Sequence, residues 1–167
     1  MQPEHVAHII EQPITINSDL KKIINDADFR EGIAWHKRRF KAGGCILEEG
    51  TEGRSLFLIE KGDVRVMVTL KIERRVRPGI CDLHAGNLFG ELNLFEQHPR
   101  SASVTAVTDV ELLEIDGECL SRYLNNHPEI GYPILKNLFK LMVSRLNKAN
   151  RRIEYLLGWG LKAHDIN

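Results

Sequence analysis

Phe-Gly-Glu-Leu-Asn-Leu at residues 89–94 is followed by Pro-Arg-Ser-Ala-Ser at residues 99–103. This stretch brings one carboxylate, Glu91, and one guanidinium, Arg100, close together in the chain. A glycine that opens a short helical turn leaves N–H groups free to point at an anion, and Gly90 stands at that position. A guanidinium offers paired donors to two phosphate oxygens, whereas an ionised carboxylate accepts hydrogen bonds from sugar hydroxyls. The stretch therefore predicts a site for one ligand with two ends, a ribose and a phosphate.

The same residues closely resemble the phosphate-binding cassette of the cyclic-nucleotide-binding domain family, and we call residues 89–103 the cassette. In this family, Phe-Gly-Glu-Leu is followed by a short loop and then by arginine and small residues. The separation of Glu91 and Arg100 is similar to that in protein kinase A regulatory subunits, and Arg100-Ser101-Ala102 resembles the triplet of catabolite activator proteins. The resemblance covers about residues 36–157. It implies a jelly roll that binds without catalysis, with these ligand-binding residues: Phe89, Gly90, Glu91, Leu92, Arg100, Ser101 and Ala102.

Short runs typical of β-strands alternate with turn residues between about residues 35 and 115. They are Ile46-Leu47, Leu56-Phe57-Leu58-Ile59, Val64-Arg65-Val66-Met67-Val68, Val104-Thr105-Ala106-Val107 and Val110-Glu111-Leu112-Leu113-Glu114-Ile115. Several strands at such spacing favour an antiparallel sandwich or barrel, in agreement with the jelly roll that the resemblance implies. We predict a mainly β, α+β chain with helices at both ends. Its parts are an N-terminal helical segment over residues 1–34, a barrel with the cassette over 35–115, and lid or dimerisation helices over 116–167.

The apolar spacing becomes helical after residue 116. A short helix is predicted around residues 120–124, with its end near His127-Pro128 because proline cannot continue the hydrogen-bond ladder. A longer helix is predicted from about Pro133 to Leu157, since the glycines at 158 and 160 can terminate it.

The long helix carries apolar residues at a spacing close to a heptad repeat. They are Leu138, Met142, Leu146, Ala149, Ile153 and Leu156. Such a stripe has two interpretations, which can both hold on different faces of the helix. The helix packs on its own barrel, or it forms a parallel homodimer like that of catabolite activator proteins.

The base of the ligand is less well defined by the sequence. The resemblance places Ala149 and Asn150 where catabolite activator proteins carry the Thr-Ser pair that reads adenine. An asparagine amide can pair with adenine or guanine edges, so this departure leaves the base open. Ser101 follows the arginine as in an adenine-binding relative, although a hydroxyl at this place also helps to bind guanine in cyclic-GMP readers. We expect cyclic AMP as the ligand, cyclic GMP as the alternative, and Asn150 among the binding residues.

The charge balance gives no sign of a nucleic-acid or membrane partner. Lys plus Arg and Asp plus Glu both number 23, so no net field draws the chain to a polyanion. The basic stretch His36-Lys37-Arg38-Arg39 and the later Arg74, Arg75 and Arg77 are predicted to be solvated, because runs of charge usually are.

Cysteines and the N-terminus bear on compartment and metal content. Cys45, Cys81 and Cys119 have no paired spacing, which predicts reduced, buried thiols rather than a disulfide framework or a metal site. The N-terminus lacks a basic start with an apolar core, and no apolar run approaches the ~18 residues of a spanning helix. We predict a cytoplasmic protein without a metal cofactor.

Three classes of function follow from these observations. The first is a free-standing sensor or regulatory subunit that signals to an unidentified downstream protein by rearranging its helices. The second is a scaffold with a degenerate pocket, in which Glu91 and Arg100 form only a structural salt bridge. The third is a small-molecule enzyme on the barrel, but no nucleophile and base pair is visible in the sequence.

Overall fold

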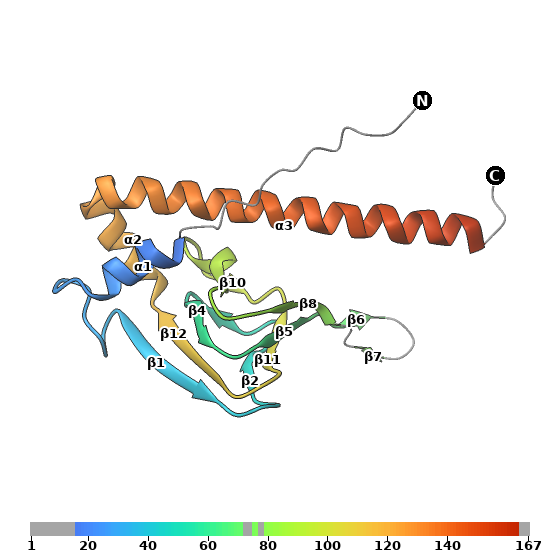
Figure 1. Ribbon diagram of the computed structural model, residues 1–167, viewed down its shortest axis with the longest axis horizontal. Coiled ribbons are helices and arrows are strands. Elements are labelled where there is room, and N and C mark those ends of the chain that lie inside the picture. Colours follow the sequence, from blue (N-terminus) through green and yellow to red (C-terminus); the bar gives the residue numbers. More distant parts are fainter. Residues whose placement is uncertain (1–15, 72–74, 77–78, 164–167) are drawn as a thin grey trace.

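The computed structural model describes residues 16–71, 75–76 and 79–163 (Figure 1). Helix α1 (Ile16–Ile24) precedes the strands, and α2 (Gly117–Asn126) and α3 (Pro128–Ala163) follow them. Two four-stranded sheets carry the fold, and every pairing between their strands is antiparallel. This confirms the predicted α+β fold with antiparallel sheets and a long C-terminal helix. Residues 1–15 of the predicted N-terminal segment lie outside the described residues.

The strand order places the cassette between the two sheets. The first sheet contains, in order, β1 (Trp35–Phe40), β12 (Val110–Ile115), β4 (Leu56–Lys61) and β9 (Leu88–Phe89). The second contains β2 (Cys45–Leu47), β11 (Ser103–Ala106), β5 (Val64–Met67) and β8 (Gly79–Leu83). Two further pairs join β3 (Glu52–Gly53) to β10 (His98–Pro99) and β6 (Leu70–Lys71) to β7 (Arg75–Val76). The cassette thus leaves the first sheet at β9, passes through η1 (Glu91–Asn93) and β10, and enters the second sheet at β11.

Strand β4 shows how the first sheet contributes side chains to two apolar cores. Its residues 56–59 are all buried, and alternate side chains of a strand point to opposite faces. Phe57 and Ile59 pack between the sheets against residues of β5 and β11, whereas Leu56 and Leu58 pack under the helices. The first sheet is therefore covered on both sides, which accounts for its continuous apolar run.

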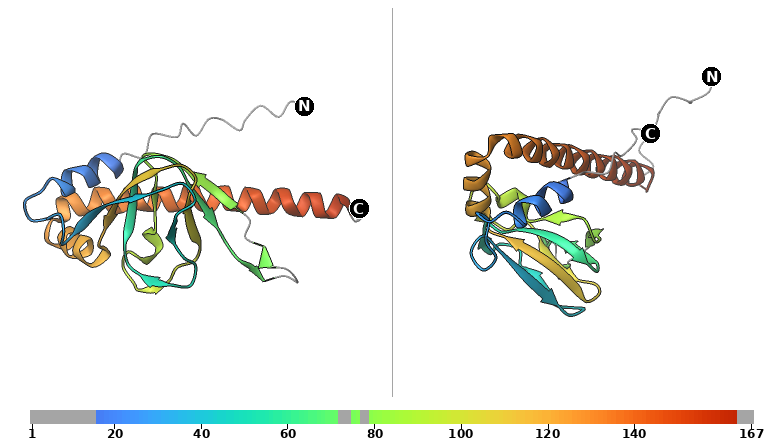
Figure 2. Two further views of the ribbon diagram at one scale, coloured as in Figure 1. Left: turned by 90° about the horizontal axis from the view of Figure 1, so that it is seen from below. Right: turned by 60° about the vertical axis from the view of Figure 1, so that its left-hand side comes forward.

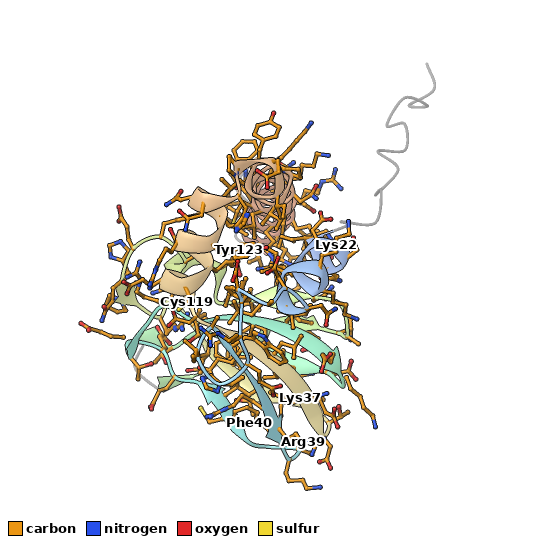
Figure 3. The ribbon with its side chains drawn as sticks, turned by 90° about the vertical axis from the view of Figure 1, so that its left-hand side faces the viewer. Lys22, Lys37, Arg39, Phe40, Cys119 and Tyr123 are labelled. Atoms are coloured by element: carbon orange, nitrogen blue, oxygen red, sulfur yellow. The ribbon has the colours of Figure 1, made fainter. Side chains whose placement is uncertain are left out.

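The three helices cover the outer face of the first sheet (Figure 2). They contribute one apolar stripe each, comprising Ile16, Leu20 and Ile23 of α1, Leu120, Tyr123 and Leu124 of α2, and Ile134 and Leu138 of α3. Tyr123 points from α2 towards the segment after α1 (Figure 3), and its hydroxyl donates to Asp26 Oδ2 at 2.7 Å. Asp116 caps α2 by accepting from the N–H of Cys119, and α2 ends at Asn126, next to the predicted His127-Pro128.

Helix α3 departs from its predicted limits at both ends. It begins at Pro128, includes Pro133 in its second turn and continues through Gly158 to Ala163. Gly158 is not among the glycines with positive φ, so it does not adopt the left-handed conformation with which glycine ends a helix. The 36 residues span about 54 Å, and the C-terminal part extends beyond the sheets in Figure 1.

The two faces of α3 separate the two interpretations of its apolar stripe. Leu138, predicted as part of the heptad, is buried in the core under the helices, so it belongs to the inner face. A complete heptad spacing instead follows the outer face, where most members are exposed and Met142 is half-buried. We call this set the outer stripe; it comprises Tyr132, Leu135, Phe139, Met142, Leu146, Ala149, Ile153 and Leu156.

The basic stretch lies on β1, and Figure 3 labels Lys37 and Arg39 at the end of the sheet farthest from the helices. Lys37 pairs with Glu60 at 3.0 Å, Arg38 with Glu114 at 3.4 Å and Arg39 with Glu111 at 3.3 Å. Carboxylates of neighbouring strands therefore balance these charges. The side chains of Arg74, Arg75 and Arg77 lie outside the described residues.

The remaining sequence predictions concern cysteines, metals and membranes. All three cysteines are free, but Cys45 is exposed and the other two are half-buried, so the prediction of buried thiols was wrong. In the described part of the chain, no group of three or more His, Cys, Asp or Glu side chains could hold a metal ion. No helix of the same part is long and apolar enough to cross a membrane.

Candidate functional site

The cassette is built around a left-handed glycine. Gly90 has φ +81°, and a Cβ at this position would lie 2.7 Å from the carbonyl oxygen of Ser55 and 3.1 Å from Nη1 of Arg100. Only glycine fits both the conformation and the space. It turns the chain from β9 into η1, where Asn93 is buried and its side-chain amide donates to the carbonyl oxygen of His98. This bond, which sequence reasoning missed, closes the loop of the cassette.

Arg100 lies inside the turn that Gly90 makes. The residue is only 5% exposed, and its Nη1 donates to the carbonyl oxygen of Gly90 at 3.2 Å. Its Cζ lies 6.0 Å from the centroid of the Phe57 ring, which stacks at 5.0 Å on the ring of Phe89. A Cβ on Gly53 would come within 2.9 Å of Nη2, so a second glycine makes room for the guanidinium.

No carboxylate of the described residues forms an ion pair with Arg100 within 4.0 Å. Burial lowers the pKa of Arg100, and the more distant charges of Glu114 and Glu91 act in the opposite direction. Burying a guanidinium without a counter-ion costs free energy, and a bound anion would remove that cost. The phosphate end of the predicted site therefore has the electrostatics of an anion-binding site.

Glu91 lies across the cassette and points to the helices. Its side chain is 7% exposed, and its Oε1 accepts from Nη1 of Arg145 at 2.6 Å. The second terminal nitrogen of Arg145 donates to the carbonyl oxygen of Leu88. The salt bridge between Glu91 and Arg100 that the scaffold alternative requires is therefore not formed, because Glu91 pairs with α3 instead.

Most of the predicted site residues gather here. Phe89 is buried against Phe57, Leu92 is exposed on η1, Ser101 is exposed, and Ala102 is half-buried. Asn150 is the exception, because it is exposed on α3, five residues after Arg145, without a hydrogen bond to the cassette in the described structure. Sequence reasoning missed Arg145, since nothing local indicates which side chain of a long helix meets a glutamate 54 residues away.

Comparison with known proteins identifies the class of domain to which this site belongs. The family model described as the cyclic nucleotide-binding domain matches residues 37–127. The chain belongs to the cyclic nucleotide-binding domain family. The match begins on β1 and ends at the C-terminus of α2, so it includes both sheets and the cassette.

The chain matches only part of each of two curated relatives. The cyclic AMP receptor protein of Thermus thermophilus is 32% identical over 73% of this chain and 54% of its own length. Glutaminase 2 of Bradyrhizobium diazoefficiens is 34% identical over 71% of this chain but only 18% of its own length. A solved cyclic nucleotide-binding domain from Methylobacillus flagellatus superposes with a TM-score of 0.66 at 27% identity, over 72% of this chain and 66% of that structure. The chain thus spans about half or less of the curated relatives that it matches.

Proposed function

We propose that this chain is a cyclic-nucleotide sensor whose ligand is cyclic AMP. The observation that carries the proposal is Arg100, a buried guanidinium without a partner carboxylate among the described residues, held in a turn of the cassette. The cyclic phosphate binds at Arg100 and at the neighbouring amides of Ser101 and Ala102. The ribose hydroxyl binds at Glu91, and Phe89, Gly90 and Leu92 hold the turn between these two ends.

The choice of cyclic AMP rests on Ser101 and on the relatives. Ser101 follows the arginine as in an adenine-binding member of the family, and one matched relative is named a cyclic AMP receptor protein. Asn150 is proposed to read the base when α3 closes over the ligand, and its amide suits both adenine and guanine. Cyclic GMP is therefore the second candidate ligand.

The route of signalling is proposed to run through the pair of Glu91 and Arg145. Because Glu91 is both the ribose-binding residue and the acceptor for Arg145 of α3, a ribose hydroxyl at this carboxylate changes how α3 is held. A ligand shifts a conformational equilibrium only if it binds two states with different affinity. This shared carboxylate supplies such a difference, and α3 would pass the change to a downstream protein.

The outer stripe of α3 is proposed to form a parallel homodimer. Its spacing is an uninterrupted heptad repeat, and Ile153 and Leu156 have the β-branched and leucine order that favours two parallel helices. Arg145 and Arg152 flank one side of the stripe, whereas Asn150 and Leu157 flank the other. In a parallel pair, opposite flanks meet, so that no arginine faces an arginine.

Sedimentation of the full chain tests the dimer with one core and one surface variant. Ile153→Lys should convert a dimer into a monomer, because it places two cations in the apolar interface, whereas Lys140→Gln should leave the mass unchanged. A parent protein that sediments as a monomer at all micromolar concentrations would contradict this arrangement.

Calorimetric titration with cyclic AMP and cyclic GMP tests the ligand. Arg100→Ala removes the charge-assisted contact to the phosphate, about 1.5–3 kcal/mol, so affinity should fall by about 10- to 150-fold. Arg39→Ala removes the same charge from an exposed position on β1 and should bind like the parent. Absence of heat with both ligands would contradict the sensor and favour a scaffold that acts through the outer stripe. Equal binding by Arg100→Ala and the parent would show that the site is elsewhere.

A further inference from the structure

Arg54, between β3 and β4, touches two segments that are remote in sequence. Its Nη2 donates to the carbonyl oxygen of Phe95, at the end of the cassette turn, at 3.4 Å. Its Nη1 donates to Oε2 of Glu118, in the first turn of α2, at 3.5 Å. One guanidinium therefore bridges the cassette and the helical layer.

The first residue of α2 fits closely against the same place. A Cβ on Gly117 would lie 2.3 Å from the carbonyl oxygen of Arg54 and 3.0 Å from that of Leu94. No side chain could be accommodated here without moving backbone atoms. The end of the cassette turn, the backbone of Arg54 and the start of α2 are thus in direct contact.

The backbone of Arg54 is fixed to the sheet. The next residue, Ser55, donates through its hydroxyl to Glu114 on β12 at 3.1 Å, and Leu56 pairs in register with Ile115 and is fully buried. The cassette and α2 contact the side chain of Arg54 from two sides, while its backbone is held by β4 and β12. A movement of either one therefore acts on the guanidinium of the Arg54 side chain, while the backbone of Arg54 stays in place.

The hydrogen bonding of Arg54 is incomplete in this arrangement. Both terminal bonds are at the long end of the range, and the Nε–H is buried without an acceptor in the described structure. A buried donor without an acceptor destabilises the arrangement that leaves it so. A second arrangement, in which the Phe95 carbonyl or Glu118 moves closer and accepts from the unpaired N–H of Arg54, would not carry this cost.

We infer that Arg54 is a positioning residue that couples the cassette to α2. The inference rests on the proposed function, because the ligand at Arg100 and Glu91 is what displaces the cassette. When the cassette moves, the Phe95 carbonyl shifts relative to Nη2 of Arg54. Because the guanidinium is rigid and planar, it turns as a unit, and its Nη1 then re-orients Glu118. The ligand signal then reaches α2 by this contact in addition to the pair of Glu91 and Arg145.

Amide hydrogen exchange of the full chain, measured without nucleotide and with saturating cyclic AMP or cyclic GMP, tests the coupling. In the parent protein, the nucleotide should slow exchange in residues 89–95 and change it in α2 over Gly117–Asn126. In Arg54→Gln, the cassette should respond as in the parent, while the ligand-induced change in α2 should fall about fivefold or more. Glu118→Gln should give the same loss, and the double variant no further loss, because both single variants break the contact between Arg54 and Glu118.

Two further variants show whether the loss in α2 is due to the Arg54 contacts or to a general effect on folding or charge. Arg54→Lys keeps the charge but lacks the rigid planar group whose two separate nitrogens contact Phe95 and Glu118, so it should also lose the response of α2. Arg65→Gln, which breaks an exposed pair with Asp82 on the second sheet, should keep that response. A parental response of α2 in Arg54→Gln or Arg54→Lys would overturn the inference. A parent cassette that responds to neither cyclic nucleotide would instead overturn the proposed function, and this inference with it.

Discussion

The sheets and the helical layer are held together in different ways. Within each sheet, antiparallel ladders join the strands, and residues of β4 and β12 contribute to two apolar cores, one of which lies between the sheets. The helices share one of those cores, but their polar contacts to the rest of the chain include isolated links such as the one from Tyr123 to Asp26 and the one from Arg145 to Glu91. A ladder holds a strand by a backbone hydrogen bond at successive residues, whereas an isolated side-chain contact can be replaced by a contact to another group.

The difference assigns separate roles to the two regions. Arg100, at the phosphate end of the proposed site, packs against Gly53, Gly90 and Phe57, so its position is set by the sheets and their connecting turns. Glu91, at the ribose end, is bonded to the helical layer. A ligand that spans both ends therefore joins a rigid part to an adjustable one.

The largest effect is expected from a change in the rigid part. Gly90→Ala should lower stability by about 1–2 kcal/mol because of the positive φ, and by more because the new methyl group meets the Ser55 carbonyl. The first term alone corresponds to a melting temperature lower by about 2–8 °C. The methyl group also displaces Arg100, so cyclic AMP affinity should fall as well.

Gly32→Ala is a matched control for Gly90→Ala. Gly32 has the same φ of +81°, but nothing lies within 4 Å of a Cβ built there. Thermal unfolding of both variants separates backbone strain from crowding. Equal melting temperatures and equal nucleotide binding of the two variants would refute the role given to the space beside Arg100.

A smaller effect is expected from the link between α3 and the cassette. Arg145→Gln leaves the nearly buried carboxylate of Glu91 without its cation, at a cost of about 1–3 kcal/mol in the free energy of unfolding. Glu91→Gln in the same chain should restore part of this loss, with a coupling of about 0.5–3 kcal/mol in the double-mutant cycle. Urea titration measures all four proteins, and Lys140→Gln on the exposed side of α3 controls for lost helix charge. Strictly additive effects would show that the two side chains do not interact in solution.

The contrast between the regions also explains what the sequence predicted. The cassette residues are contiguous, so the sequence alone was sufficient to place Gly90, Glu91 and Arg100 together. Strands with a clear apolar run, such as β12, were predicted within one or two residues. Strand β1 was not identified as a separate run, because Trp35–Phe40 is charged and mostly exposed where it pairs with carboxylates.

The side-chain contacts between the helical layer, the cassette and the sheets were not predicted from the sequence, for a different reason. Arg145 and Glu91 are 54 residues apart, and Arg54 and Phe95 are 41 apart. Such pairs depend on how a helix rotates and docks, which no local spacing encodes. The end of α3 was predicted too early for a related reason, since whether Gly158 terminates a helix depends on a conformation that its surroundings select.

The smallest predicted effect concerns the link from α2 to the segment after α1. Burial, and then the hydrogen bond to Asp26, raise the pKa of Tyr123 to about 12. The folded chain thus holds the phenol proton more tightly than the unfolded chain, whose tyrosines titrate near 10. This stabilisation is complete below about pH 10 and is lost as the pH rises to about 12, with a slope of at most about 1.4 kcal/mol per pH unit. Denaturant titrations at several pH values should show a shallower decline for Tyr123→Phe than for the parent, and an unchanged one for Tyr155→Phe, whose side chain is exposed outside the outer stripe. If Tyr123→Phe and the parent lose stability in parallel, the phenol does not hold α2 to Asp26 in solution, and apolar contacts hold Tyr123 at this place.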